Sequence, residues 1–168
     1  MTGFSNGGMM TYRFAAERGN LLAAAAPLAA SIGGRPSAGA PEWRIPEPVR
    51  PLPILTIHGL ADDDIPFDGG VSHHRGGERS YLSVADSVDF WVRVNGCGPR
   101  VTADIYGGRV RSSVWEDCSE GGKVALYAIQ EWGHVWPGNA TIKTGKDPDL
   151  AGFDAAELIW EFFKTQSR

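Results

Sequence analysis

The sequence has no long hydrophobic run, few cysteines and no excess of basic residues. No apolar run approaches the ~18 residues that a membrane-spanning helix requires, so we expect no membrane partner. Lysine and arginine number 16 against 20 acidic residues, which gives a net charge of −4 and argues against nucleic acid as a partner. No CxxC or Cys/His spacing suggests a zinc site, and neither a signal peptide nor an internal repeat is visible.

The overall amino-acid composition is typical of a compact protein. Hydrophobic residues make up 42% of the chain and charged residues 21%. A chain of 168 residues with these proportions can bury a real core. We therefore expect residues 1–168 to form a single domain.

Ser5 lies in a G-x-S-x-G sequence between Gly3 and Gly7. This is the spacing of a nucleophile elbow, a sharp strand-to-helix turn in which the two glycines leave room for the backbone. With 22 glycines in the chain, the match by itself could be accidental. An elbow also needs a preceding strand, and only Met1 and Thr2 are available, so a functional motif implies that the sequence begins within a fold.

An acid and a histidine follow Ser5 in the order that serine hydrolysis on a doubly wound sheet requires. Residues 53–57 predict a buried strand, and three acids, Asp62, Asp63 and Asp64, come just after it. Residues 123–130 alternate like a strand, and His134 lies in the loop that leaves it. From the residues alone, any of the three acids could orient this histidine.

Other histidines and tryptophans are candidates with simpler explanations. His58 sits at the strand end, so we expect a structural residue beside the acid and not a base. His73 and His74 lie among glycines and are expected in an exposed loop. Trp132 and Trp136 flank His134, where they either line a substrate cleft or pack the loop.

The remaining elements follow from periodicity, caps and turn residues. We expect helices and strands in alternation: a helix over 9–18, a strand over 23–27, a helix over 84–95 opened by a capping box at Ser83, a hairpin around Gly107 and Gly108, and a last helix after Asp154. Residues 36–53 hold six of the eleven prolines, which predicts a surface connection without regular structure.

Four ordered motifs together carry a resemblance. They are Gly3 to Met10, His58-Gly59-x-Ala61-Asp62-x-x-Ile65-Pro66 followed by Gly69-Gly70, Asn95-Gly96-Cys97, and Gly133-His134-x-Trp136-Pro137-Gly138. Through them nearly the whole chain resembles the secreted α/β-hydrolase esterases that include polyhydroxybutyrate depolymerase-like and feruloyl esterase-like enzymes.

The resemblance implies a site and a fold. Ser5 would be the nucleophile, Asp62 the acid and His134 the base, with the amide of Asn6 as an oxyanion-hole donor. Members of the family are longer at the N-terminus, so the expected fold is the C-terminal part of an α/β-hydrolase, a mostly parallel half-sheet flanked by helices. The second oxyanion donor of the family lies in the part that this sequence lacks.

The resemblance also implies a reaction and a location. We expect a serine carboxylic-ester hydrolase, without cofactor, that acts on small-molecule or polymeric esters of short acyl, hydroxyalkanoate or feruloyl type. It implies secretion and a disulfide between Cys97 and Cys118, for which two unrelated buried thiols are the alternative. The alternative function is a truncated, weakly active or inactive chain that serves as an oligomeric interaction module.

An uncovered sheet edge would have a further consequence. If no strands precede the elbow, the strand at 23–27 or the stub at Met1 and Thr2 has unpaired backbone groups that invite pairing. We therefore expect a homo-oligomer, most simply a two-fold dimer with an apolar interface on the elbow side of the sheet.

Overall fold

The structure is a computed structural model that describes residues 1–72, 78–138, 150 and 152–166. His73 and His74 lie outside the described residues, so their expected exposure stays a prediction. None of the described helices is long and apolar enough to cross a membrane.

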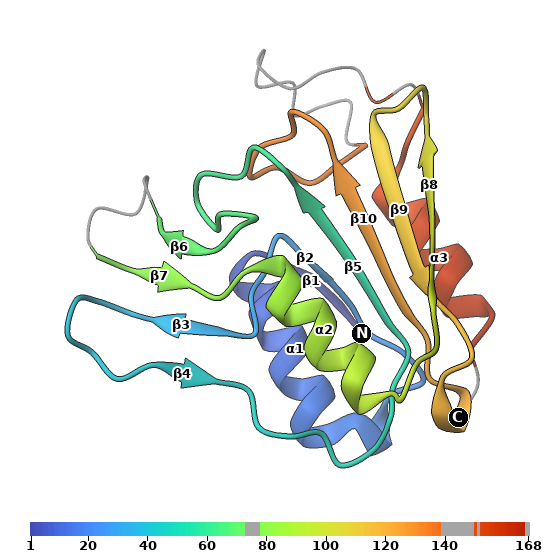
Figure 1. The fold of residues 1–168 in the computed structure, drawn as a ribbon, viewed down its shortest axis with the longest axis horizontal. Helices are drawn as coiled ribbons and strands as arrows, with labels where there is room; N and C mark the ends of the chain where they lie inside the picture. Colours follow the sequence, from blue (N-terminus) through green and yellow to red (C-terminus); the bar gives the residue numbers. More distant parts are fainter. Residues whose placement is uncertain (73–77, 139–149, 151, 167–168) are drawn as a thin grey trace.

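A six-stranded mixed sheet runs through the molecule in the order β1-β2-β5-β10-β9-β8 (Figure 1). In this order the strands are Thr2–Phe4, Ala26–Leu28, Ile54–Gly59, Val124–Ile129, Val110–Trp115 and Arg100–Ile105. The first four run parallel, and β9 and β8 complete the sheet as an antiparallel hairpin. The expected α/β class, mostly parallel sheet and hairpin are therefore confirmed.

Helices cover both faces of this sheet (Figure 1). Helices α1 (Asn6–Arg18) and α2 (Val84–Val94) bury Tyr12 and Trp91 in one core cluster. Helix α3 (Ala155–Lys164) buries Ile159 in a second cluster, together with Leu28 and Ile57 of the sheet. Because each sheet face is covered, strand β5 is buried along its whole length, as parallel strands in α/β proteins usually are.

A small second sheet lies beside α1 and α2, on the side away from the hairpin (Figure 1). Its order is β4 (Trp43–Arg44), β3 (Gly33–Arg35), β7 (Ser80–Tyr81) and β6 (Gly70–Val71), all antiparallel. The expectation that residues 36–53 contain no regular structure was wrong at β4. Trp43 and Arg44 lie between the prolines, so their backbones can still pair with β3.

The element boundaries partly follow the sequence signals. The capping box of α2 is confirmed: the Ser83 hydroxyl accepts from the Asp86 amide (2.9 Å), and the Asp86 carboxylate accepts from the Ser83 amide (3.0 Å). Two boundaries were predicted wrongly. Helix α1 begins at Asn6 and not at residue 9, because the turn at Ser5 already directs the chain into the helix. Strand β2 covers Ala26–Leu28, because pairing with β1 and β5 selects its register within an alanine-rich segment that has no periodicity.

The Asn95-Gly96-Cys97 motif ties the end of α2 to the start of β5. The buried Asn95 side chain accepts from the Leu52 amide (3.0 Å) and donates to the Leu52 carbonyl (2.8 Å). Gly96 then takes a positive φ of 55°, which favours glycine after a helix. The predicted disulfide joins Cys97 to Cys118 next to the short 3₁₀ helix Ser119–Gly121; a second 3₁₀ turn, Gly19–Leu21, follows α1.

β1 stands at one end of the strand order, as the uncovered-edge hypothesis expects. The predicted homodimer itself stays a prediction, because the structure describes a single chain.

The disulfide should contribute measurably to stability. It joins residues 21 apart, and the double variant Cys97→Ser, Cys118→Ser should lower the free energy of unfolding by about 3 kcal/mol, mainly because the unfolded chain gains freedom. Urea unfolding of oxidised wild type and variant measures this difference. A change below about 0.5 kcal/mol would contradict a stabilising crosslink.

Candidate active site

Ser5 lies in a sharp turn between β1 and α1. Its φ of 56° and ψ of −121° are unusual for a residue with a side chain, and such a conformation persists only where the surroundings hold it. The Ser5 amide donates to the Leu28 carbonyl (3.0 Å), and the Ser5 carbonyl accepts from the Met9 amide (3.0 Å). The turn is therefore held from the sheet on one side and from the helix on the other, as a nucleophile elbow requires.

The two glycines of the motif have different roles. A Cβ atom on Gly3 would lie 2.4 Å from the Gly7 carbonyl oxygen and 2.9 Å from Thr11 Oγ1, so this position accepts only glycine. A Cβ atom on Gly7 would meet nothing within 4 Å. The expectation that both glycines leave room for the turn was therefore wrong for Gly7, because this residue points away from β1 and into open space.

Three parallel strands end at the same edge of the sheet and bring the predicted residues together. Ser5 follows β1, Asp62 follows β5, and His134 follows β10. His134 Nε2 lies 2.8 Å from Ser5 Oγ, and His134 Nδ1 lies 2.8 Å from Asp62 Oδ2. Because the carboxylate can only accept, Nδ1 carries a proton, and Nε2 is then the acceptor for the serine hydroxyl.

Asp62 is the acid of this arrangement, among the three acids that the sequence left open. Its Oδ1 accepts from the amides of Asp64 (3.0 Å) and Ile65 (2.8 Å) in a tight turn, which points Oδ2 toward His134. Burial by itself would raise the pKa of Asp62, but hydrogen bonds from His134 and His58 and the Ile65 amide outweigh it and hold the pKa well below its usual range.

His58 lies on the other side of the same carboxylate. Its Nε2 is 2.9 Å from the Ile65 carbonyl oxygen and 3.3 Å from Asp62 Oδ2, and both groups can only accept, so the proton is on Nε2. Its buried Nδ1 has no partner among the described residues. His58 is thus a neighbour of the acid, as its position at the strand end suggested, and has no contact with Ser5.

The loop that carries His134 is closely packed. Phe4 lies against the imidazole with ring centroids 4.8 Å apart, and only 10% of the His134 side chain is exposed. A Cβ atom on Gly59 would lie 2.1 Å from the Trp132 carbonyl oxygen, so the glycine of the His58-Gly59 pair allows the two loops to approach. That carbonyl accepts from the Ala61 amide (3.0 Å), which joins the acid loop to the histidine loop.

The two tryptophans of the predicted cleft differ in their surroundings. Trp132 is buried, and its indole N–H donates to the Val135 carbonyl at 2.8 Å, so it packs the loop and does not line an open cleft. Trp136 is half-buried, with its ring 6.3 Å from that of Phe4. Trp136 therefore lies near His134, because Phe4 contacts both rings.

The start of α1 provides positive charge beside Ser5. Asn6 is the first residue of α1, where backbone N–H groups lack an acceptor within the helix and the helix dipole is positive. These groups suit a developing negative charge on a substrate oxygen. In the described part of the chain, no group of three or more His, Cys, Asp or Glu residues could hold a metal ion.

No protein-family model matches the chain. Feruloyl esterase B of Piromyces equi is 29% identical over 134 residues, which cover 79% of this chain and 24% of that protein. "Putative esterase NocK" of Nocardia uniformis subsp. tsuyamanensis is 32% identical over 151 residues, which cover 81% of this chain and 41% of that protein. These similarities support an esterase family. The chain spans less than half the length of either relative.

Sequence reasoning located the three residues that meet here but not what holds them. The Phe4 contact with His134 had no signal, because it joins residues 130 positions apart. The close approach at Gly59 did have a sequence signal, since a glycine that ends a buried strand often marks a place where another backbone comes near.

The two motif glycines give a matched pair of variants. Gly3→Ala should destabilise the protein by more than about 2 kcal/mol, because its Cβ clashes with backbone. Gly7→Ala should leave stability unchanged or raise it by up to about 1 kcal/mol, since alanine is the better helix former. Urea unfolding of both variants tests this contrast. Equal losses of stability in the two would contradict the elbow geometry.

The lowered pKa of Asp62 predicts a pH dependence of stability. Its folded pKa lies below the unfolded value of about 3.9, so the stabilisation is present above that pH and is lost as the pH falls toward the folded pKa. Asp62→Asn does not titrate. The stability difference between wild type and this variant should shrink by on the order of 1 kcal/mol between about pH 6 and pH 3. A constant difference in urea unfolding over this range would refute the prediction.

Proposed function

We propose that the chain carries the active site of a serine carboxylic-ester hydrolase, with Ser5 as nucleophile, His134 as base and Asp62 as acid. The observation that carries the proposal is the continuous hydrogen-bonded path from Ser5 Oγ through both His134 nitrogens to Asp62 Oδ2, at 2.8 Å for each contact. The esterase-named relatives support the same reaction class.

The proposed mechanism follows from the tautomer of His134. Ser5 Oγ attacks the ester carbonyl carbon while Nε2 takes its proton, and the carbonyl oxygen becomes an oxyanion. Nε2 then returns the proton to the leaving alcohol, and water releases the acyl group by the same two steps. The Asp62 carboxylate stabilises the imidazolium and keeps the proton on Nδ1.

The Asn6 amide is the proposed oxyanion donor, because it directly follows Ser5 at the N-terminus of α1. A serine hydrolase normally uses two such donors, and loss of one typically costs about 10²–10³ in rate. The second donor has no assignment in the described residues. Full activity therefore requires a second donor in addition to the Asn6 amide.

The arrangement of strands and loops is compatible with the C-terminal part of an α/β-hydrolase fold, which we propose for this chain. The substrates we propose are esters with short acyl, hydroxyalkanoate or feruloyl-type groups, in small molecules or polymers. The disulfide is consistent with an extracellular protein, because such bonds persist in oxidising compartments.

A second candidate is a weakly active or inactive chain that works as an oligomeric interaction module. It is favoured by the position of β1 at the end of the strand order, because an edge strand can pair with a second copy of the chain. It predicts negligible ester hydrolysis by the purified chain and a stable dimer in sedimentation experiments.

Hydrolysis of 4-nitrophenyl acetate and butyrate separates the two candidates. Ser5→Ala should lower kcat/KM by about 10³ or more, because the nucleophile is lost. Ser119→Ala, at an exposed serine in the 3₁₀ helix Ser119–Gly121, is the matched control and should keep wild-type activity. Activity that survives in Ser5→Ala would rule out the serine mechanism. Inactive wild type would favour the interaction module.

A further inference from the structure

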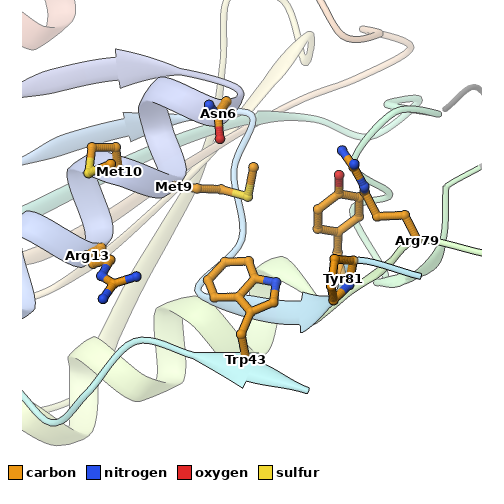
Figure 2. A pocket seen from close by; sticks show the side chains of 8 residues that line it. Asn6, Met9, Met10, Arg13, Trp43, Arg79 and Tyr81 are labelled. Carbon is orange, nitrogen blue, oxygen red and sulfur yellow. The ribbon is translucent and has the colours of Figure 1, made fainter. Parts of the chain in front are cut away.

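A surface cavity of about 250 Å³ lies beside Asn6, between α1 and the small four-stranded sheet. Its helix side is formed by Asn6, Met9 and Arg13, and its sheet side by Trp43, Arg79 and Tyr81. Figure 2 shows the Met9 side chain extending from α1 toward the rings of Trp43 and Tyr81, with Arg79 beside the tyrosine. The cavity therefore starts at the residue that follows Ser5 and extends along α1 to Arg13.

The walls combine flat apolar surfaces with positive charge. Trp43 and Tyr81 offer aromatic faces, and Met9 is a flexible apolar side chain that adapts to a planar group. The eight described residues around the cavity include two arginines and no acid. Arg13 donates to Glu17 at 2.8 Å, so part of its charge is already compensated, and Arg79 is the more effective cation.

The position of the cavity relative to His134 decides which half of an ester fits it. The alcohol half must lie near His134 Nε2, because that nitrogen returns the proton to it. His134 and its neighbours Phe4 and Trp136 do not line this cavity, whereas Asn6, the proposed oxyanion donor, does. The acyl half, which stays on Ser5, is therefore the half that points into the cavity.

We infer that this cavity is an acyl-binding site for an aromatic acid that carries a negatively charged substituent on its ring. The ring lies between Met9, Trp43 and Tyr81, and its anionic group pairs with the Arg79 guanidinium. This inference rests on the proposed function, and it specifies the substrate class of the same site.

The charge selectivity can be tested with two esters that share one leaving group. The probes are 4-nitrophenyl benzoate and the mono-4-nitrophenyl ester of terephthalic acid. The enzymatic rate for each ester is divided by the rate at which hydroxide hydrolyses the same ester, which corrects for its intrinsic reactivity. Wild type should prefer the anionic ester by about fivefold, the selectivity of a partly exposed ion pair, and the preference should fall as salt is added. In Arg79→Gln the ratio should approach one.

Arg18→Gln is the matched control. Arg18 is an exposed arginine at the far end of α1, so this variant makes the same charge change away from the cavity and should keep the wild-type ratio. Equal loss of the preference in both variants would mean that only the net charge matters, and would overturn the inference.

The aromatic wall gives a second, independent measurement. Trp43→Leu should lower the ratio of benzoate to acetate ester turnover by up to about tenfold, because an aromatic contact is lost while an apolar side chain remains. The acyl site would be refuted if wild type showed no preference for the anionic ester. It would also be refuted if the ratio of anionic to neutral ester turnover were unchanged in Arg79→Gln and the ratio of benzoate to acetate ester turnover were unchanged in Trp43→Leu. The proposed function would still stand if Ser5→Ala abolished hydrolysis of all the esters.

Discussion

The carboxylate of Asp62 is the group on which the site depends. Its side chain is fully buried, and a buried charge is tolerated only where hydrogen bonds replace the lost water. The donors come from three places: the turn that follows Asp62, His58 in strand β5, and His134 in the loop after β10. Satisfying this one charge therefore joins the ends of two neighbouring strands.

The same demand explains the residues around the acid. His58 donates toward both the Ile65 carbonyl and the carboxylate, so it closes the turn that aims Oδ2 at His134. Gly59 lets the backbone of Trp132 come close enough for the Ala61 amide to reach it. The elbow at Ser5 is built separately, from β1 and α1, and meets the imidazole from the opposite side.

The small second sheet supplies one side of the proposed acyl-binding site. It contributes nothing to the hydrogen-bonded path, but it supplies one wall of the cavity beside α1 (Figure 2). The proposed path for the proton and the proposed surface for the acyl group therefore belong to different parts of the chain. A change in Trp43, Arg79 or Tyr81 could alter the preferred ester while the path from Ser5 to Asp62 stays the same.

The sequence alone determined the elements that local patterns specify. The buried run at residues 53–57 and the alternation at 123–130 predicted two strands, and parallel strands place the loops that follow them at one edge. The glycine-flanked Ser5 and the order of serine, acid and histidine then predicted which residues meet there. The choice of Asp62 over its two neighbours came from family resemblance, because three adjacent acids are equivalent in local sequence.

Tertiary structure decided what depends on contacts between distant segments. It gave the glycines of the elbow unequal roles, because only Gly3 faces the backbone of α1. It extended α1 to Asn6 and placed Trp132 in the packed interior of its loop, since both depend on what lies opposite them. The cavity had no sequence signal at all, because its walls come from α1, β4, β7 and the residues next to β3 and β7, and only the fold brings these segments together.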